Sequence, residues 1–340
     1  MFGIGTEIRN SLEQVVIRAK GSIVAMFPEP TEGKFSITNM AVPYGNVWYV
    51  DGDKSASLDG KSWAGAYKTI QEGIDAASAG DLILVRARTI AASVSDPVDY
   101  AEALTIGSGK SGLSLVGIAD GRTQGRLPQI KKGSGSAAQL IIRSPGVLVA
   151  NLGFNGGSAT GGGILLESTA ASLTDAFGAV IANCHFKNCK GATATDAASG
   201  GAIQLSGAPW QIAILYNKFY KNVGGIVLKD TAQSVPQDLH IEGNSFAGSA
   251  AAVDCDIYLK GGSGPGTGLV IKGNDFNVFP ALASGANLRW MDLTGADGGL
   301  AAGNYFADDK TFGATGTGAI VPTTVFLAGN YDEGGLIARV

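Results

Sequence analysis

Residues 239 to 246 read Leu239-His-Ile-Glu-Gly-Asn-Ser-Phe246, and residues 269 to 276 read Leu269-Val-Ile-Lys-Gly-Asn-Asp-Phe276. In both stretches apolar residues alternate with other residues, a Gly-Asn pair follows, and a Phe stands two positions after the Asn. Alternation of period two is typical of a β-strand with one face in a core. The recurrence of one short pattern at a nearly fixed period is the signature of a repeat architecture, so the chain is predicted to be a solenoid.

The pattern recurs through the second half of the chain. The residues in the Asn position of the repeat are Leu152, Cys184, Asn217, Asn244, Asn274, Asn304 and Asn330. The successive spacings are 32, 33, 27, 30, 30 and 26 residues, which contradicts a β-propeller with its blades of roughly forty residues. A second set of strands opens with a glycine pair, so each coil is predicted to hold at least two strands. Stacked coils would turn the Asn column into a structural ladder, because each amide can bond the backbone and the Asn of its neighbours.

Composition excludes several classes of function. The 340 residues include 51 Gly, which indicates frequent turns, and carry a net charge of -4, so nothing favours nucleic acid or an anionic membrane as a partner. No apolar run approaches the roughly twenty residues of a membrane span, and the first ten residues lack the features of a secretory signal. The three Cys residues do not suggest a disulfide framework, so assembly in a reducing cytosol is expected.

The chain is predicted to divide into a docking segment, residues 1–45, and a β-helix, residues 46–340. In the first part, apolar residues at helical spacing favour an amphipathic helix over residues 4–19, and a hairpin around Lys20-Gly21 is the alternative. In the second part, Thr69 and Glu72 form the capping box of a helix over residues 69–79, and Gly80 ends it before a strand at residues 82–85.

Two segments around that helix carry a family resemblance. They are Asn46-Val-Trp-Tyr-Val-Asp51 and the stretch from Asp59 through the helix to Val85. Together they resemble the N-terminal end of right-handed β-helix proteins of the pectate-lyase-like superfamily, which includes many phage tailspikes. The resemblance implies an all-β fold, a single-stranded right-handed parallel β-helix with a short N-terminal capping helix, and an assembly of three chains.

On the strands that precede the Asn ladder, the outward positions are mostly apolar. A solvated sheet face should alternate apolar and polar residues, so this face is expected to be covered, either by a loop of the same chain or by a symmetric oligomer interface. The interface is favoured because the apolar stripe runs through seven coils. The predicted interface residues are Leu148, Val180, Val270, Leu300 and Phe326.

The strands opened by glycine pairs carry polar outward residues. Asp256 and Asp292 are expected on adjacent coils, roughly 8 Å apart, which is within the range for the acid and base of an inverting glycoside hydrolase. Aromatic and basic neighbours could hold the sugar rings of a polysaccharide. The predicted carbohydrate-binding residues are Tyr258, Trp290, Lys229 and Lys260. Solubility alone also explains charges on an exposed sheet face.

No metal site or cofactor is expected. The only histidines, His185 and His240, are predicted at outward strand positions without a carboxylate cluster beside them. Cys184 falls in the ladder column and should be a small buried apolar residue. The lyases of the similar family gather several carboxylates and a basic residue on one sheet, and the sequence shows no such group around Asp254-Cys-Asp256.

These observations favour a bacteriophage virion surface protein, either a tailspike-like adsorption protein or a capsid decoration, assembled in the host cytoplasm. Its expected partners are two further copies of itself in a homotrimer, other virion proteins through residues 1–45, and a host-surface polysaccharide. The alternative is a polysaccharide lyase or glycoside hydrolase on the same β-helix fold. The short stretch after Asp332 leaves no room for a C-terminal trimerisation domain, which favours a structural or binding role.

Overall fold

The structure is a computed structural model. It describes residues 8–9, 14–19, 22–28, 45–89, 98–119, 127–157, 159–168, 175–191, 200–207, 209–229, 235–247, 255–261, 266–277, 289–307, 312–313, 319–332 and 334–337. The chain divides into two compact units, Met1–Ala41 and Val42–Val340. Within the ranges just given, no helix is both long enough and apolar enough to cross a membrane.

The first unit is a small antiparallel sheet. Its strands are β1 (Ile8–Arg9), β2 (Gln14–Ala19) and β3 (Ser22–Pro28), in the order β1-β2-β3. The favoured prediction of an amphipathic helix over residues 4–19 is therefore wrong, and the hairpin alternative holds. The consecutive β-branched residues Val15, Val16 and Ile17 explain the outcome, because their side chains lose rotamer freedom in a helix and fit a strand better.

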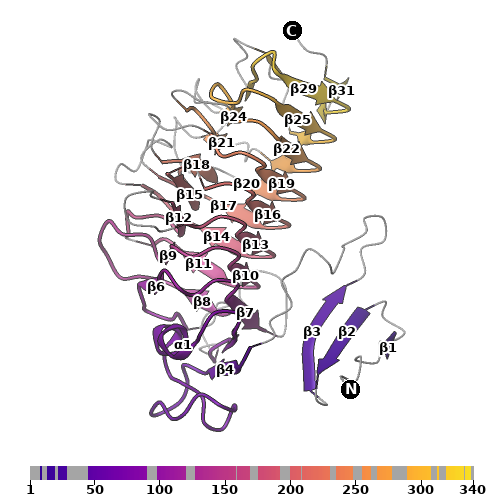
Figure 1. Cartoon of the computed structure of the whole chain (residues 1–340). Helices are drawn as coiled ribbons and strands as arrows, with labels where there is room; N and C mark the ends of the chain where they lie inside the picture. The colour runs from indigo at the N-terminus through magenta and orange to yellow at the C-terminus, as the bar shows by residue number, and fades with distance from the viewer. Residues whose placement is uncertain are drawn as a thin grey trace. The chain divides into compact units, whose positions relative to one another are not determined.

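The second unit is a right-handed parallel β-helix with three sheets along its length (Figure 1). Sheet 1 consists of β4 (Val47–Val50), β5 (Leu82–Arg86), β7 (Ser114–Ile118), β10 (Leu148–Ala150), β13 (Val180–Ala182), β16 (Ala213–Leu215), β19 (His240–Glu242), β22 (Leu269–Lys272), β25 (Gly299–Ala302) and β29 (Val325–Ala328). Sheet 2 consists of β8 (Gln129–Ile130), β11 (Gly153–Asn155), β14 (His185–Lys187), β17 (Lys218–Tyr220), β20 (Ser245–Ala247), β23 (Asp275–Asn277), β26 (Tyr305–Phe306), β30 (Tyr331–Asp332) and β31 (Gly335–Leu336). Sheet 3 consists of β6 (Leu104–Ile106), β9 (Leu140–Ile142), β12 (Ile164–Glu167), β15 (Ile203–Ser206), β18 (Ile226–Leu228), β21 (Cys255–Tyr258), β24 (Arg289–Asp292), β28 (Ala319–Ile320) and β27 (Phe312–Gly313).

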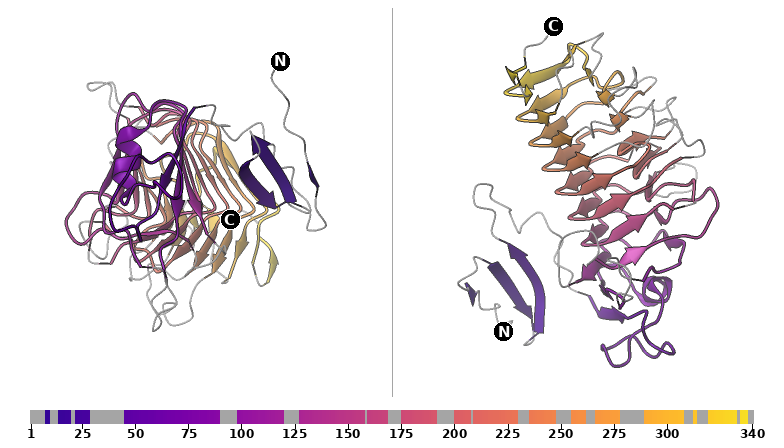
Figure 2. Two further views of the ribbon diagram at one scale, coloured as in Figure 1. Left: turned by 90° about the horizontal axis from the view of Figure 1, so that it is seen from below. Right: turned by 180° about the vertical axis from the view of Figure 1, so that it is seen from behind.

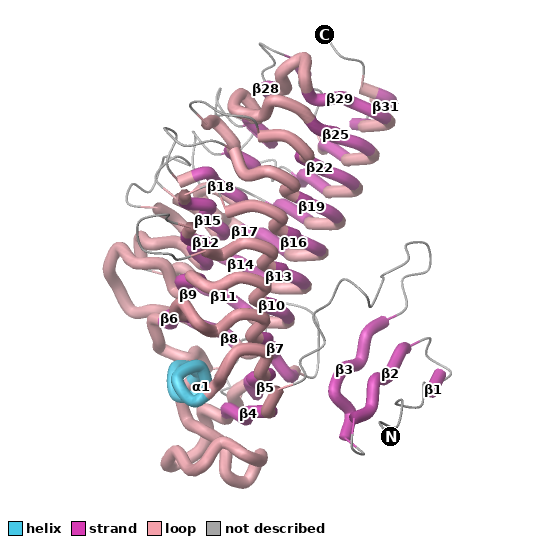
Figure 3. Tube along the Cα trace, in the orientation of Figure 1, coloured by secondary structure: helices cyan, strands magenta, loops and turns pink. Residues whose placement is uncertain are grey.

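Each full coil contributes one strand to each sheet, as the regular succession of short strands in Figure 3 shows. Neighbouring strands pair in parallel throughout, except for the terminal antiparallel pair β30 and β31. Three strands per coil satisfy the prediction of at least two. The third strand is the one in sheet 2, which follows the Asn column and carries the repeated Phe.

The predicted Asn ladder is confirmed. The backbone N–H and the side-chain amide of Asn244 both donate to Oδ1 of Asn274, at 2.9 and 3.0 Å, and Asn274 donates in the same way to Asn304. Each ladder amide also donates to a strand carbonyl on the preceding coil, as Asn274 does to Ile241 at 2.9 Å. These buried polar groups are therefore paired with one another at every step from Asn217 to Asn330.

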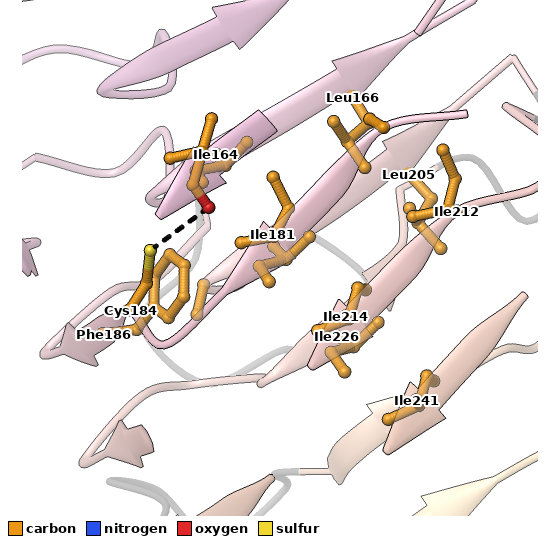
Figure 4. Packing of buried hydrophobic residues seen from close by; sticks show 14 of the residues in the cluster. Ile164, Leu166, Ile181, Cys184, Phe186, Leu205, Ile212, Ile214, Ile226 and Ile241 are labelled. Carbon is orange, nitrogen blue, oxygen red and sulfur yellow. Dashed lines mark hydrogen bonds between the residues drawn. The ribbon is translucent and has the colours of Figure 1, made fainter. Parts of the chain in front are cut away.

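A stack of phenylalanine rings runs beside the ladder inside the coil. The rings of Phe154, Phe186, Phe219, Phe246, Phe276 and Phe306 follow one another with centroids 4.6 to 5.1 Å apart and with planes 4° to 10° from parallel. Ile, Leu and Val side chains from sheets 1 and 3 fill the rest of the core (Figure 4). In the ladder column Cys184 lies close to Phe186, fully buried, as predicted.

The N-terminal end of the β-helix is closed by helix α1 (Ile70–Ala76), behind which the coils recede when viewed from below in Figure 2. The capping box predicted from Thr69 and Glu72 is present, with the Thr69 side chain accepting from the Glu72 amide and the Glu72 carboxylate accepting from the Thr69 amide. Glu102 accepts from the backbone N–H groups of Ile70 and Gln71, at 2.9 and 3.0 Å. The backbone N–H groups of the first turn, which have no partner within the helix, are thus hydrogen-bonded to the side chains of Thr69 and Glu102.

Asp81 ties this end cap to the first strand. Its carboxylate accepts from the backbone N–H of Ser78 at 2.8 Å, from the indole of Trp48 at 2.8 Å and from the backbone N–H of Asn46 at 2.6 Å. Burial acts to raise the pKa of Asp81, but these donors outweigh it and hold the pKa below its ordinary value. The ionised carboxylate is therefore the form that stabilises the folded cap.

Replacement of Asp81 by Asn is expected to lower thermal stability at neutral pH, because Asn offers one acceptor oxygen in place of two. A carboxyl whose folded pKa is depressed contributes stability above its unfolded pKa of about 3.9, and this contribution is lost as the pH falls through the folded value. The difference in melting temperature between wild type and Asp81→Asn should therefore shrink below about pH 4. A difference that stays constant from pH 7 to pH 3 would show that the charge of Asp81 does not contribute.

Candidate functional site

Six residues were predicted on the outer face of sheet 3. In the structure, four of them have side chains that are partly or fully exposed on this face. Asp256 and Tyr258 on β21 are half-buried, and Lys229 and Lys260 follow the ends of β18 and β21 as exposed side chains. The register pairs Tyr258 with Asp292, so Asp256 and Asp292 lie on adjacent strands offset by two residues, as expected. The catalytic role of these two carboxylates is still a prediction.

The other two residues of that face are buried. Asp292 is only 2% exposed, and its carboxylate accepts from the hydroxyl and the backbone N–H of Thr294, at 2.5 and 3.1 Å. Trp290 is also 2% exposed, and its ring lies 5.0 Å from that of Phe306, at the end of the phenylalanine stack. The expectation that Trp290 points outward to a sugar is wrong, because burial of the large indole in the core outweighs the alternation of the strand.

The apolar stripe on the outer face of sheet 1 is in the predicted register. Its residues are paired from strand to strand through the intervening Ala213 and His240: Leu148, Val180, Val270, Leu300 and Phe326. Exposure differs along the stripe, from 4% at Leu148 to 65% at Phe326, and an ion pair between Lys272 and Glu242, 3.6 Å long, lies beside its middle. The homotrimer is still a prediction, which the mass of the protein in solution would test.

The outer face of sheet 2 has the opposite character, and the sequence patterns above did not reveal it. Because every Phe of the stack points inward, the residues on either side of it point outward. The outward side chains of this face are Gln129, Asn155, His185, Lys187, Lys218, Tyr220, Ser245, Asp275, Asn277, Tyr305 and Tyr331. All eleven are polar, and Ala247 on β20 is the one apolar side chain among the outward positions of the parallel strands of this sheet, so sheet 2 offers the most continuous polar face of the three sheets.

Two neighbouring coils on this face form a basic cluster, which consists of His185, Lys187, Lys218, Tyr220 and Lys221. His185 is paired with Lys218 and Lys187 with Tyr220 in the β14–β17 register. The ammonium group of Lys221 lies 5.1 Å from the centroid of the Tyr220 ring. His185 and Lys187 are each 6% exposed, whereas Lys218 and Lys221 are exposed.

The positive charge of the basic cluster is not neutralised at its exposed end. Among the residues that the structure describes, neither Lys218 nor Lys221 has a carboxylate oxygen within 4 Å. The chain as a whole carries a net charge of -4, so this concentration of cations is local. Like charges on neighbouring strands destabilise a sheet, and an anion bound between them would relieve this repulsion.

At the far end of the same face lie groups suited to hydrogen bonding and ring stacking. Asp275 accepts from the side-chain amide of Asn277 through Oδ2 at 2.7 Å, while its buried Oδ1 has no hydrogen-bond partner in the described part of the chain. One strand further on, the rings of Tyr305 and Tyr331 lie with centroids 5.3 Å apart. The face therefore passes from cations through hydrogen-bonding groups to aromatic rings along the axis of the coil.

Neither the thiols nor the acidic residues offer a second kind of site. Burial raises the pKa of the Cys184 and Cys189 thiols to about 12, so both stay protonated and unreactive near neutral pH. Within the described ranges, no three His, Cys, Asp or Glu side chains gather closely enough to hold a metal ion.

Comparisons with known proteins agree with the fold. No protein-family model matches the chain, and a search of curated proteins finds no significant match. Among solved structures, the GH136 lacto-N-biosidase from Eubacterium ramulus is similar with a TM-score of 0.50 and 10% identity, over 86% of this chain and 57% of that one. This chain thus spans little more than half the length of that enzyme.

Two further solved structures are more distant. The pectin methylesterase from Aspergillus niger matches with a TM-score of 0.39 and 13% identity, over 86% of this chain and 87% of its own. The alginate lyase from a Paenibacillus species matches with a TM-score of 0.42 and 12% identity, over 79% of this chain and 96% of its own. At such identities the likeness concerns the β-helix fold alone, and it lends no support to the virion role or the tailspike character expected from the sequence.

Proposed function

We propose that the protein binds an acidic polysaccharide along the outer face of sheet 2. The observation that carries this proposal is the basic cluster, whose exposed lysines Lys218 and Lys221 have no carboxylate partner in the described part of the chain. A lyase or hydrolase that acts on this polysaccharide, the alternative hypothesis from the sequence, agrees better with the similar solved structures than the virion hypothesis does, because their names are those of carbohydrate-acting enzymes. The virion role is an untested expectation.

The chemistry of the face matches that ligand class. A uronate sugar offers a carboxylate, which forms strong charge-assisted hydrogen bonds with ammonium groups, and a ring whose apolar face can stack on an aromatic side chain. Tyr220 is paired with Lys187 on the adjacent strand, and its ring centroid is 5.1 Å from the ammonium group of Lys221, so one cluster supplies both contacts. A β-helix face also repeats about every 4.8 Å along its axis, so a long chain can contact several coils in succession.

The binding test uses hexagalacturonate as the probe and isothermal titration calorimetry as the measurement. We expect the double variant Lys218→Ala/Lys221→Ala to bind at least about tenfold more weakly than wild type, because two hydrogen bonds to a charged group are lost. Wild-type affinity should also fall as salt is raised, since exposed charges are screened. The double variant should show a smaller dependence on salt.

The matched control is Lys229→Ala/Lys260→Ala, which removes the same charge from the outer face of sheet 3, where the sequence placed the carbohydrate site. This control should bind as wild type does. Loss of binding in the control alone would move the site to sheet 3, beside Asp256. Equal binding by wild type and both double variants would contradict a role for either face.

A further inference from the structure

A second aromatic pair, one ring exposed and one half-buried, lies away from sheet 2, on the turn that leads from sheet 3 into sheet 1. Trp210 is 46% exposed and is the most exposed of the four tryptophans. Its ring centroid is 5.3 Å from that of Phe177, which occupies the same position one coil earlier, and the two planes are inclined by 47°. Phe177 is half-buried, and the exposed Trp210 ring is not required by the fold, whose core lies on the other side of these strands.

The backbone of this turn is the same from coil to coil. The amide of Gly178 donates to the carbonyl of Trp210 at 3.0 Å, and the amide of Gln211 donates to the carbonyl of Gln237 at 2.9 Å. The equivalent residues Phe177, Trp210 and Gln237 are each followed by a residue with a positive φ. The φ values are 66° at Gly178, 54° at Gln211 and 51° at Asp238. These hydrogen bonds align the side chains of successive turns in columns parallel to the axis.

Near Trp210 the residues with positive φ in this column are not glycine, although glycine is the residue that this left-handed conformation favours. Gln211 and Asp238 accept a left-handed conformation at a cost of about 1 kcal/mol or more each, and both side chains are exposed. Strain of this kind persists where the surrounding structure enforces it, and it is concentrated at functional sites. Gln211 follows Trp210 directly, and Asp238 occupies the equivalent position one coil further on, with its carboxylate close to Gly268.

Phe177 is held in place by a hydrogen-bonded support. Oδ1 of Asp175 accepts from the backbone N–H of Phe177 at 3.0 Å and from the hydroxyl of Ser168 at 2.8 Å, and Ser168 Oγ in turn accepts from the amide of Ala176 at 3.1 Å. These hydrogen bonds fix the backbone of the turn at Phe177 in the absence of a ligand. A rigid aromatic surface lowers the entropic cost of binding.

We propose that this turn is a second binding site, which takes a neutral oligosaccharide. Phe177 and Trp210 stack against the apolar faces of two successive sugar rings, and Gln211 and Asp238 hydrogen-bond to sugar hydroxyls. The combination of flat rings with flanking polar side chains is what a sugar requires, since each pyranose has an apolar face and a polar rim. A second copy of the protein would instead need a broader apolar patch than two rings among polar neighbours.

Titrations with cellohexaose and with xylohexaose, followed by calorimetry and by tryptophan fluorescence, test this site. Wild type should bind at least one of the two probes saturably, and Trp210→Ala should weaken that binding about tenfold. Trp210→Tyr, which keeps an aromatic ring, should retain most of the affinity. Because Trp210 is the most exposed tryptophan, the tryptophan fluorescence change of wild type should disappear in both variants, and the affinity that Trp210→Tyr retains is read from calorimetry.

The matched control is Phe326→Ala, which removes an even more exposed aromatic ring, from sheet 1, and should bind as wild type does. Absence of binding for both probes, wild-type affinity in Trp210→Ala, or an equal loss in Phe326→Ala would each overturn the proposal. The two sites fail independently. Lys218→Ala/Lys221→Ala should keep its affinity for the neutral probes, and Trp210→Ala should keep its affinity for hexagalacturonate.

Discussion

Replacement of Asn274 by alanine is expected to destabilise the protein by about 2–6 kcal/mol, because two buried groups lose their partners at about 1–3 kcal/mol each. These groups are the backbone N–H of Asn244, which donates to Asn274 Oδ1 at 2.9 Å, and the carbonyl of Ile241, which accepts from Asn274 Nδ2 at 2.9 Å. Asn274 is 1% exposed, so water cannot replace the missing amide without entering the core.

The global effect would be measured as a shift of the urea unfolding midpoint. The local effect would be measured by hydrogen exchange, where the amide of Asn244 should exchange faster in the variant even under conditions in which the protein stays folded. Asn277→Ala is the matched control, because Asn277 is half-buried, lies on the outer face of sheet 2 and makes one side-chain hydrogen bond, to Asp275. A ladder without energetic importance would give both variants the same small shift.

The ladder could be predicted because an Asn side chain that points into the core must find hydrogen-bond partners there. The alternation of Ile241 and Leu239 placed the strand, and the repeat spacing placed its neighbours one coil away. Given stacked coils, a buried amide has only the backbone and the amides above and below it as partners. The same reasoning gave the capping box at Thr69 and Glu72, which depends on residues close together in sequence.

Sheet 2 was not predicted because its strands are too short to show a period. The strand Lys218–Tyr220 has three residues, and only Tyr216 and Asn217 separate it from Leu215 at the end of the preceding strand. Tyr216 turns the chain with a φ of 55°, a conformation that the sequence does not signal at a tyrosine. The recurrence of polar residues on both sides of the repeated Phe was the available signal.

The candidate site was hidden for the same reason. His185 and Lys218 occupy equivalent positions directly after the Asn column of successive repeats, and their pairing on an outward face becomes apparent only when sheet 2 is recognised as a separate sheet. The outward positions on sheet 3 were predicted from alternation alone, which holds for Tyr258 and does not hold for Trp290, whose ring packs on Phe306. Alternation gives the direction of a side chain only where the packing of large rings does not override it.

The chemical contrast between the sheets has a single physical origin. Each coil buries its inward residues completely, so the inward columns are restricted to aliphatic, aromatic and ladder positions. The outward columns are free to differ from sheet to sheet, and they do, from the apolar stripe of sheet 1 to the basic cluster of sheet 2. The fold therefore supplies rigid, parallel columns, and the function is determined by which residues occupy them.

Phe246→Ala is expected to cost about 3–5 kcal/mol, the usual range for removal of a buried Phe ring. Phe246 is fully buried, and its ring stacks on Phe219 at 4.6 Å and on Phe276 at 4.9 Å, so its loss opens a cavity in the middle of the stack. The neighbours cannot close over this cavity, since their backbones are held at the coil spacing by the adjacent ladder.

Two further variants test how this loss depends on the volume and the burial of the side chain. Phe246→Leu keeps a buried apolar side chain and should lose less stability than Phe246→Ala, because part of the volume is retained. Phe326→Ala removes a ring that is 65% exposed on sheet 1 and should change the unfolding free energy by less than about 0.5 kcal/mol. A loss at Phe246 no larger than the loss at Phe326, measured by urea unfolding, would contradict the stabilising role of the buried phenylalanine stack, because burial of the ring alone should cost several times more to remove.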